Sequence, residues 1–319
     1  MHANRTGNIL PKEFIEQLKL IYPQTYSGIL RTMEKTKPTT FRVNNIKTTQ
    51  DEVINELRKD SILTKKGPIE NSHITLKVQK IKISETEAFN NGKIYIQELS
   101  SMLPPLVLDP KEGDYILDMT ASPGSKTTQM ATLAKNNANI LAIEKNKLRY
   151  QKLKHNIELQ GAKVKTKLED SIILIKKYPE FINFFDKILL DAPCSAEGRF
   201  DSKNSRTYKY WNLKKIKEMQ SLQKRLISKA AQMLKPGGSL VYSTCTINTK
   251  ENEEVVDWIL SKDDKLKIEK IKLDMPNIKS GITTIGSREL NKDIKNTIRI
   301  IPNDLFSAFY IAKIRKENN

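Results

Sequence analysis

From about residue 89 the chain repeats one pattern, in which a short apolar run is followed by a turn and then by an amphipathic helix. Five apolar runs have the length and residue types of strands, and they cover 114–119, 139–144, 164–170, 184–192 and 238–244. Helical periodicity covers 127–137, 146–161 and 212–234. Strands that alternate with helices form parallel sheets with right-handed crossovers. We therefore expect a doubly wound, Rossmann-like α/β fold over residues 89–319.

The end of the chain departs from this alternation. The segment "TIRIIPNDLFSAFYIAKIRK", residues 297–316, contains two strand-like runs joined by a loop, with no helix between them. Without a crossover helix, two such strands pair in the antiparallel sense. We expect them to add an antiparallel edge to a mostly parallel sheet.

Residues 1–88 have the composition of a separate, smaller α/β domain. "TTFRVNNI" and "HITLKVQKIKI" alternate apolar and polar residues as strands do, and residues 49–62 between them have helical spacing. In the second segment the apolar face is Ile74, Leu76 and Val78. A β-α-β order fits a ferredoxin-like or RRM-like domain that binds RNA, and it fits a structural cap equally well. The expected domain boundary lies between residues 88 and 89.

The charge of the chain indicates the kind of partner. Lysine and arginine number 55 against 37 acidic residues, which gives a net charge of +18 and a pI near 9.6. Such a balance favours a polyanion, nucleic acid before an anionic membrane, although a lysine-rich proteome would produce it too. No apolar run approaches the roughly 18 residues of a membrane span, and "MHANRTGNILPKEF" lacks the apolar core of a secretory signal. We expect a cytoplasmic monomer without membrane attachment.

The turn after the first strand of the large domain is the expected cofactor site, because ligands of doubly wound sheets bind at the carboxyl ends of strands. This turn has one glycine, Gly124, and matches neither the dinucleotide-binding nor the triphosphate-binding glycine pattern. Acidic residues end three successive strands instead: Asp118, Glu144 and Asp170. Glu144 is placed to reach ribose hydroxyls and Asp170 to approach adenine, while each acid alone could be a helix cap. A phosphate-free nucleoside with a cationic arm is S-adenosylmethionine.

Both cysteines of the chain also follow predicted strands. Asp191 ends the fourth strand, Cys194 comes three residues later, and Cys245 ends the fifth. A single cysteine in such a place is more often a buried small apolar residue. Two cysteines do not form a disulfide framework, and the three histidines are scattered, so we expect no metal site. We expect both thiols and Asp191 to face the cofactor cleft.

Two thiols beside a methyl donor fit methylation at carbon 5 of a pyrimidine. That carbon becomes nucleophilic only after a thiolate adds to carbon 6, and an acid near nitrogen 3 stabilises the charge that develops. A base then removes the carbon 5 proton, and the thiolate leaves. One thiol can act as nucleophile, provided that nearby positive charge lowers its pKa, and the second can act as base.

Three segments that carry these residues, "LDMTASPGSKT", "LLDAPCSAEG" and "VYSTCT", resemble signature motifs of the Sun family of RNA cytosine-5 methyltransferases, also called Fmu or Nol/Nop/Sun. "PTTFRVN", "GKIYIQELSSMLP" and "AFYIAKIRK" are similar as well, so the resemblance covers residues 38–315. It implies that Cys245 is the nucleophile, that Cys194 assists product release, and that Asp191 contacts cofactor and base. DNA cytosine methyltransferases use the Pro-Cys thiol as nucleophile and lack the second one.

The resemblance also implies a cofactor site. The turn that would hold the methionine part consists of Thr120, Ala121, Ser122, Pro123, Gly124, Ser125 and Lys126. Glu144 and Asp170 match the ribose and adenine ligands. The chain departs from the family pattern at Thr120, Ser122 and Ser125, where Cys-Ala-Ala-Pro-Gly-Gly-Lys is frequent, at Ala196, where glycine is frequent, and at Pro302-Asn303, where Pro-His is expected.

The segment "GRFDSKNSRTYKYWNLKKIK" after Cys194 mixes basic and aromatic residues, which is typical of loops that contact RNA backbone and stack on bases. The aromatic residues could equally anchor the following helix. The sequence therefore predicts S-adenosylmethionine-dependent methylation of a cytosine in ribosomal or transfer RNA. The alternatives are a non-catalytic RNA-binding ribosome-assembly factor with a vestigial fold and, more distantly, a DNA or small-molecule methyltransferase.

Overall fold

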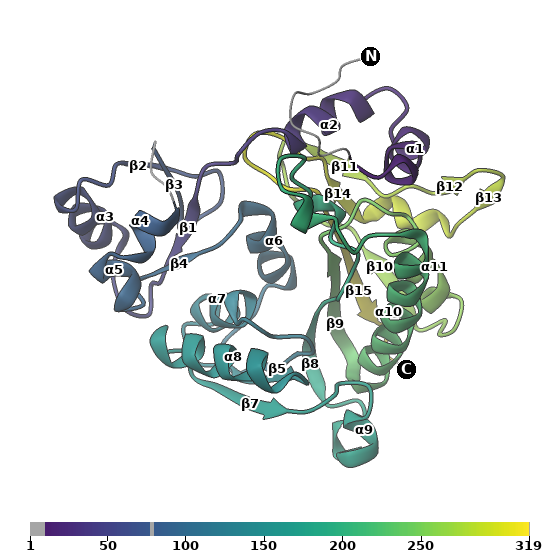
Figure 1. Cartoon of the computed structure of the whole chain (residues 1–319). Coiled ribbons are helices and arrows are strands. Elements are labelled where there is room, and N and C mark those ends of the chain that lie inside the picture. The colour runs from purple at the N-terminus through teal and green to yellow at the C-terminus, as the bar shows by residue number, and fades with distance from the viewer. Residues whose placement is uncertain (1–9, 77–79, 319) are drawn as a thin grey trace.

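Within the residues that the computed structural model describes, 10–76 and 80–318, a nine-stranded sheet forms the centre of the larger unit (Figure 1). Its spatial order is β11 (Ile278–Ser280), β14 (Ile298–Ile300), β15 (Phe309–Lys316), β9 (Leu234–Thr244), β8 (Phe185–Asp191), β5 (Tyr115–Asp118), β6 (Asn139–Glu144) and β7 (Val164–Leu168), with β10 (Leu266–Glu269) paired to β15. The strands from β9 to β7 are parallel. The doubly wound, Rossmann-like prediction is confirmed, with the strand order reversing at β5.

The antiparallel part of the sheet is larger than the sequence indicated. β15 pairs antiparallel to β9, and β14 pairs antiparallel to β15, as expected for the end of the chain. β10 and β11, which were not predicted, pair antiparallel to β15 and β14. These two strands are only four and three residues long and contain few apolar residues, so no alternation marks them in the sequence.

Helices cover both faces of the sheet. On one face α6 (Leu99–Leu108) and α7 (Ser125–Leu133) pack on strand residues such as Ile116, while α8 (Lys147–Leu159) packs on β6 beside them. On the other face α10 (Leu213–Met233) and α11 (Glu253–Leu260) pack on residues such as Leu117 and Tyr242. Consecutive strand residues point alternately into the apolar cores on the two faces of the sheet. Both faces are covered, so the sequences of these strands are nearly continuous apolar runs. Short helices follow β7 and β8: α9 (Leu174–Lys177), η1 (Pro179–Phe181), η2 (Glu197–Arg199) and η3 (Ser205–Thr207).

The smaller unit is a four-stranded antiparallel sheet with helices on one side. Its order is β2 (Thr64–Lys66), β3 (Ser72–Thr75), β1 (Thr40–Val43) and β4 (Ile94–Ile96), and its helices are α3 (Gln50–Lys59), α4 (Lys80–Ser84) and α5 (Glu87–Asn90). β4 lies beyond residue 88 and pairs with β1. The domain boundary therefore stays a prediction, and this pairing favours a point closer to residue 97.

The strand expected over 73–83 is wrong in its second half. β3 ends at Thr75, Leu76 is 42% exposed, and the chain is helical again from Lys80. Val78 lies outside the described residues. The alternation misled because Ile83, which belongs to α4, is fully buried against the same small core as the strands.

Two N-terminal helices, α1 (Lys12–Ile21) and α2 (Tyr26–Met33), were not predicted, and they pack on the large unit instead of the small sheet (Figure 1). Phe14 of α1 contacts the rings of Phe200 and Trp211 at centroid distances of 4.9 and 5.8 Å. Both of those rings follow the Cys194 segment in the sequence. The first helices therefore stabilise a loop of the large unit.

The remaining elements lie near the antiparallel edge: β12 (Thr284–Ile285) and β13 (Arg288–Glu289) form a projecting hairpin (Figure 1), and η4 (Lys292–Asn296) packs Ile294 into the main core. In the described part of the chain, every helix is too short or too polar to cross a lipid bilayer.

Candidate active site

A cavity of about 720 Å³ opens at the carboxyl ends of β5, β6, β8 and β9, between the large sheet and the small domain. Its wall combines residues of both units: Tyr95 and Gln97 come from β4 and its end, while Asp118, Glu144 and Asp191 end three strands of the large sheet. This is the edge at which doubly wound sheets bind ligands. The cavity is therefore the candidate active site.

Arg42 of β1 attaches the small domain beside this cavity. Its buried guanidinium donates to Thr128 Oγ1 of α7 at 3.2 Å and lies 5.9 Å from the ring of Tyr95. Gln97 continues the contact, because its side chain donates to Gln129 of α7 at 3.0 Å. Burial lowers the pKa of Arg42 to about 10, since its hydrogen-bond partners are neutral.

The turn between β5 and α7 forms one wall of the cavity. All of its predicted residues except Gly124 line the cavity: Thr120, Ala121, Ser122, Pro123, Ser125 and Lys126. Gly124 has a φ of +104°, and a Cβ there would lie 3.2 Å from Leu153 Cδ1 of α8. Glycine is thus required by backbone conformation and by the close approach of α8.

The three acids that end successive strands reach this cavity to different extents. Asp118 is buried beneath the turn, where its carboxylate accepts hydrogen bonds from Thr127 Oγ1 at 2.6 Å and Thr120 N at 3.4 Å. Burial raises the pKa of Asp118 to about 6. Glu144 is also buried, and it accepts from Asn146 N at 2.8 Å, while the more exposed Asp170 accepts from Ile172 N at 3.0 Å.

This set of groups fits S-adenosylmethionine. Carboxylates at the ends of β5, β6 and β7 supply acceptors for an ammonium group and for ribose hydroxyls. The turn after β5 contains a single glycine and so lacks the repeated close backbone approach that a pyrophosphate needs. The residues that would hold the cofactor are the turn Thr120–Lys126, Glu144 and Asp170, with Asp191 at the far end.

Lys126 and Asp191 form a buried ion pair in the cavity wall. The two charged groups lie 2.7 Å apart, and the side chain of Lys126 is only 8% exposed. Lys126 also donates to Ser101 Oγ at 2.7 Å, and Asp191 accepts from Ser243 Oγ at 2.8 Å. The sequence pointed to each residue separately but did not indicate that they are paired.

The two thiols meet in the cavity. Cys194 Sγ and Cys245 Sγ are 3.5 Å apart, although 51 positions separate them in the sequence. The hydrogen bond from Cys194 lowers the pKa of Cys245, and the nearby positive charges of Arg199 and Lys126 act in the same direction, against the effect of burial. The same bond, with burial, raises the pKa of Cys194. The two thiols are therefore electrostatically unequal, and Cys245 is the one that ionises more readily.

Two buried carboxylates connect the loops that carry the thiols. Glu251, from the loop after Cys245, accepts hydrogen bonds from the backbone N of Ser195 at 2.9 Å and from its hydroxyl. Glu197, from the loop after Cys194, accepts from Thr246 Oγ1 at 2.8 Å and Ile247 N at 3.1 Å. Each loop thus holds the backbone beside the other thiol.

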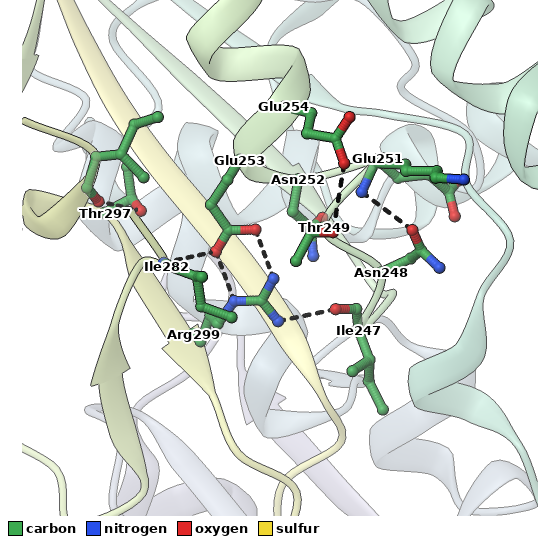
Figure 2. A network of polar contacts seen from close by, with 12 residues as sticks. Ile247, Asn248, Thr249, Glu251, Asn252, Glu253, Glu254, Ile282, Thr297 and Arg299 are labelled. Atoms are coloured by element: carbon green, nitrogen blue, oxygen red, sulfur yellow. Dashed lines mark hydrogen bonds and ion pairs between the residues drawn. The ribbon is translucent and has the colours of Figure 1, made fainter. Parts of the chain in front are cut away.

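A third carboxylate anchors the Cys245 loop from below (Figure 2). Arg299 of β14 donates to both oxygens of Glu253 at 2.5 Å and to the backbone oxygen of Ile247 at 2.8 Å. Arg299 also donates to the Tyr22 hydroxyl at the end of α1, at 3.0 Å. The signal for this anchor was the acid-rich run "KENEE", in which Glu251 and Glu253 are fully buried.

The aromatic residues after Cys194 serve mainly as anchors. Phe200, Tyr208 and Trp211 are at most 9% exposed, and the indole N–H of Trp211 donates to Glu197 at 3.0 Å. Only Tyr210, which is 77% exposed, is free to stack on a base among the aromatic residues of this described segment. The expectation of a stacking loop is therefore wrong for most of these rings.

The fold and the cavity are those of an S-adenosylmethionine-dependent methyltransferase. Acids end the parallel strands, the turn after β5 lacks a phosphate-binding glycine pattern, and two thiols lie side by side. A family model described as "16S rRNA methyltransferase RsmB/F" matches residues 105–315, and a second, described as an RsmF/B-like ferredoxin-like domain, matches residues 10–86. The chain belongs to this family, whose curated members include RNA cytosine-C5 methyltransferases, and the Sun/Fmu resemblance is confirmed.

Individual relatives extend this likeness. The chain is 43% identical over 243 residues to the tRNA (cytosine(49)-C(5))-methyltransferase of Pyrococcus abyssi, a match that covers 76% of each protein. It is 32% identical to Ribosomal RNA small subunit methyltransferase F of Vibrio atlanticus over 99% of this chain and 65% of that protein. The solved structure of NSun6 from Pyrococcus horikoshii with SFG superposes with a TM-score of 0.81 at 28% identity, covering 97% of this chain and 99% of that one. S-adenosylmethionine is accordingly the cofactor of this family.

Proposed function

We propose that this chain methylates carbon 5 of a cytosine in a structured RNA, ribosomal or transfer, through a covalent bond between Cys245 and the base. The observation that supports the proposal most directly is the 3.5 Å separation of the two sulfurs inside the cofactor cavity. A methyltransferase that acts on a nucleophilic nitrogen or oxygen needs no thiol. Two thiols in one cavity match the need of carbon 5 chemistry for a nucleophile and a base.

Cys245 carries the first step. As a thiolate, with its pKa lowered by the Cys194 hydrogen bond and by Arg199 and Lys126, it adds to carbon 6 of the cytosine and forms a carbon–sulfur bond. The electron pair released from the 5,6 double bond makes carbon 5 nucleophilic. S-adenosylmethionine, when bound by the turn Thr120–Lys126, Glu144 and Asp170, supplies the methyl group to that carbon.

Asp191 and Lys126 orient the base in this mechanism. Their ion pair lines the same cavity as Cys245, and we infer that a cytosine over Cys245 presents its nitrogen 3 edge to the pair. A hydrogen bond donated by Lys126 to the ring nitrogen offsets the charge that develops when the thiolate adds, while Asp191 holds the ammonium group in place. Ser243 and Ser101 hold the pair in position.

Cys194 completes the cycle as the base. While Cys245 is a thiolate, the proton stays on Cys194, because its pKa is raised by that neighbour and by burial. Once the sulfur of Cys245 is bound to carbon 6, its negative charge is gone, and Cys194 is able to ionise by releasing its own proton to solvent in the open cavity. It then removes the proton from carbon 5, which restores the double bond and expels Cys245.

A covalent adduct tests this scheme. Cys194→Ala, incubated with unmodified transfer or ribosomal RNA and S-adenosylmethionine, should accumulate a protein–RNA complex that survives a denaturing gel, because release is blocked. The complex should be absent from Cys194→Ala/Cys245→Ala, which serves as the matched control. If Cys245→Ala turns over normally and no variant forms an adduct, the covalent mechanism is wrong. RNA binding without any methyl transfer by the wild-type protein would favour the assembly-factor alternative.

A further inference from the structure

A second, smaller hollow, which we call the α10 groove, lies between α10 and α11 on the outside of the large unit. Its volume is about 470 Å³, and its lining consists of Ile172, Lys217, Gln220, Ser221, Lys224, Arg225, Ser228, Lys229 and Trp258. Four of these side chains are cationic and none is acidic. The groove is thus a concentrated positive surface with an aromatic ring in its wall.

The basic residues of the groove make no contribution to the buried core. α10 contains six lysine or arginine residues and one acid, and its core face consists of residues such as Ile216, Leu226 and Ala230. Lys217, Ser221, Lys224 and Ser228 recur at helical spacing on another face. Folding requires an apolar stripe on α10 but does not require cations on that second face.

The charges in the groove are not neutralised from within the described part of the chain. No ion pair involves Lys217, Lys224, Arg225 or Lys229 among residues 10–76 and 80–318, and Lys229 donates only to Gln232. The nearby acids are already engaged, since Glu218 pairs with Lys215 and Asp257 pairs with Arg288. An external anion is therefore the natural counter-charge.

Trp258 of α11 gives the groove a second kind of contact. It is partly buried against the core, and Lys224 Nζ lies 5.7 Å from its ring centroid. An aromatic wall beside lysines is suited to a nucleotide, whose base or ribose covers the ring while its phosphate meets the cations. An anionic membrane would instead favour a protruding apolar surface, and this ring is recessed.

The groove adjoins the cofactor cavity. Leu222 and Leu226 line the cavity, while Ser221 and Arg225, their neighbours on α10, line the groove. The same division occurs after β7, where Ser171 faces the cavity and Ile172 faces the groove. Residues of α10 and of the segment after β7 thus line both sites.

We propose that the α10 groove binds the phosphate backbone of the substrate RNA on one side of the target cytosine, with Lys217, Lys224 and Arg225 on successive phosphates and Trp258 against a base or ribose. This inference rests on the proposed RNA substrate but does not depend on the covalent mechanism.

The test compares two triple variants with equal loss of charge. The first is Lys217→Ala/Lys224→Ala/Arg225→Ala; the control is Lys267→Ala/Lys279→Ala/Lys292→Ala, whose lysines are exposed elsewhere on the large unit. Binding of a transfer RNA transcript is measured between 50 and 300 mM salt. The groove variant should lose affinity at least about tenfold at 100 mM salt, and its salt slope should fall by about 2 to 3, roughly 0.7 to 0.9 for each phosphate contact removed. The control should keep both values within about twofold.

Two further measurements separate this proposal from the proposed function. At saturating RNA the groove variant should retain the wild-type kcat while its KM rises, and its affinity for S-adenosylmethionine should be unchanged.

Equal loss of RNA affinity in both triple variants, or no loss in either, overturns the groove proposal even if the wild-type protein methylates RNA. Loss of binding to anionic lipid vesicles by the groove variant, with RNA binding intact, would overturn it in favour of a membrane. If the groove variant loses RNA affinity but Cys194→Ala forms no adduct, the groove proposal is supported and the covalent mechanism is wrong.

Discussion

The loops that carry the two thiols follow neighbouring parallel strands, yet they are held in different ways. The Cys194 loop, after β8, is held by Glu251 of the other loop and by Gln223 of α10, which donates to the backbone oxygen of Pro193 at 2.8 Å, and it contains Ala196 with a φ of +59°. The Cys245 loop, after β9, is held by Glu197 and also by the ion pair of Glu253 with Arg299. The thiol with the lowered pKa thus lies in the loop that is followed by a buried ion pair. A nucleophile must meet carbon 6 at a fixed position, whereas a base that accepts a proton tolerates more movement.

The largest effect should come from the extra anchor of the Cys245 loop. Glu253→Ala leaves the buried guanidinium of Arg299 without its carboxylate, so we expect the free energy of unfolding to fall by about 3–5 kcal/mol. Chemical denaturation measures this change. Glu254→Ala, the next residue on α11, removes only a partly exposed partner of Arg288 and should cost about 1 kcal/mol or less. If both variants lose a similar free energy of unfolding, the Glu253–Arg299 ion pair does not anchor the Cys245 loop more strongly than a surface contact does.

The anchor of the Cys194 loop should depend on pH. Burial raises the pKa of Glu251 to about 7 from an ordinary value near 4.5, so its stabilising effect is complete below pH 4.5 and is lost as the pH rises through 7. We expect the wild-type protein to lose about 3 kcal/mol of stability relative to Glu251→Gln between pH 5 and pH 8. Urea denaturation of both proteins across this range measures it.

The control for this pH dependence is Glu218→Gln, because Glu218 is half exposed on α10 and touches neither thiol loop. Any change with pH in the difference between this variant and the wild type is the background to be subtracted. A constant corrected difference for Glu251→Gln would mean that Glu251 is ionised throughout, and the two loop anchors would then be electrostatically alike.

The thiols themselves should differ in reactivity. Because the thiolate is the reactive form and the pKa of Cys245 is lowered while that of Cys194 is raised, we expect iodoacetamide at pH 7 to alkylate Cys245 at least about tenfold faster, a difference of about 1.4 kcal/mol. Mass spectrometry of the two peptides gives both rates. In Cys194→Ala the pH profile of Cys245 should move to higher pH, because the hydrogen-bond donor is lost. Faster labelling of Cys194 would reverse the proposed roles.

The smallest effect concerns the backbone of the Cys194 loop. Ala196→Gly should raise the free energy of unfolding by up to about 1 kcal/mol, because glycine adopts the left-handed conformation without a Cβ penalty. Ala138→Gly, at a position without positive φ, should lower it by a similar amount through chain entropy. Thermal melting of the two variants compares them. A loss of stability in both would show that Ala196 is not strained.

The sequence predicted the features that are encoded locally. Strand and helix periodicity placed the five parallel strands, and the carboxyl-end rule brought Asp118, Glu144, Asp191 and both cysteines to one cavity before any contact was known. The turn Thr120–Lys126 was located in the same way. These predictions depend on spacing over a few residues, which a single sequence contains.

The missed features all depend on contacts between distant segments. Three kinds of contact join residues 49 to 277 positions apart: the hydrogen bonds of Glu197 and Glu251 to the opposite thiol loop, the pairing of Lys126 with Asp191, and the contact of Tyr22 with Arg299. α1 was missed because its stabilising partners, Phe200 and Trp211, come much later in the chain. The strand prediction failed at residues 80–83, which are helical, for the same reason, since burial of Ile83 against the small core overrode local alternation.

The two thiols also allow the active site to be labelled and counted in the natural protein. The chain has two cysteines in all, and both lie in the cavity with their sulfurs 3.5 Å apart. A thiol count on the purified protein is therefore a count of intact active sites, without any background from the surface. A reagent that bridges two adjacent sulfurs would attach to this cavity alone, and so could carry a fluorophore or a heavy atom to the site of methyl transfer without any engineered residue.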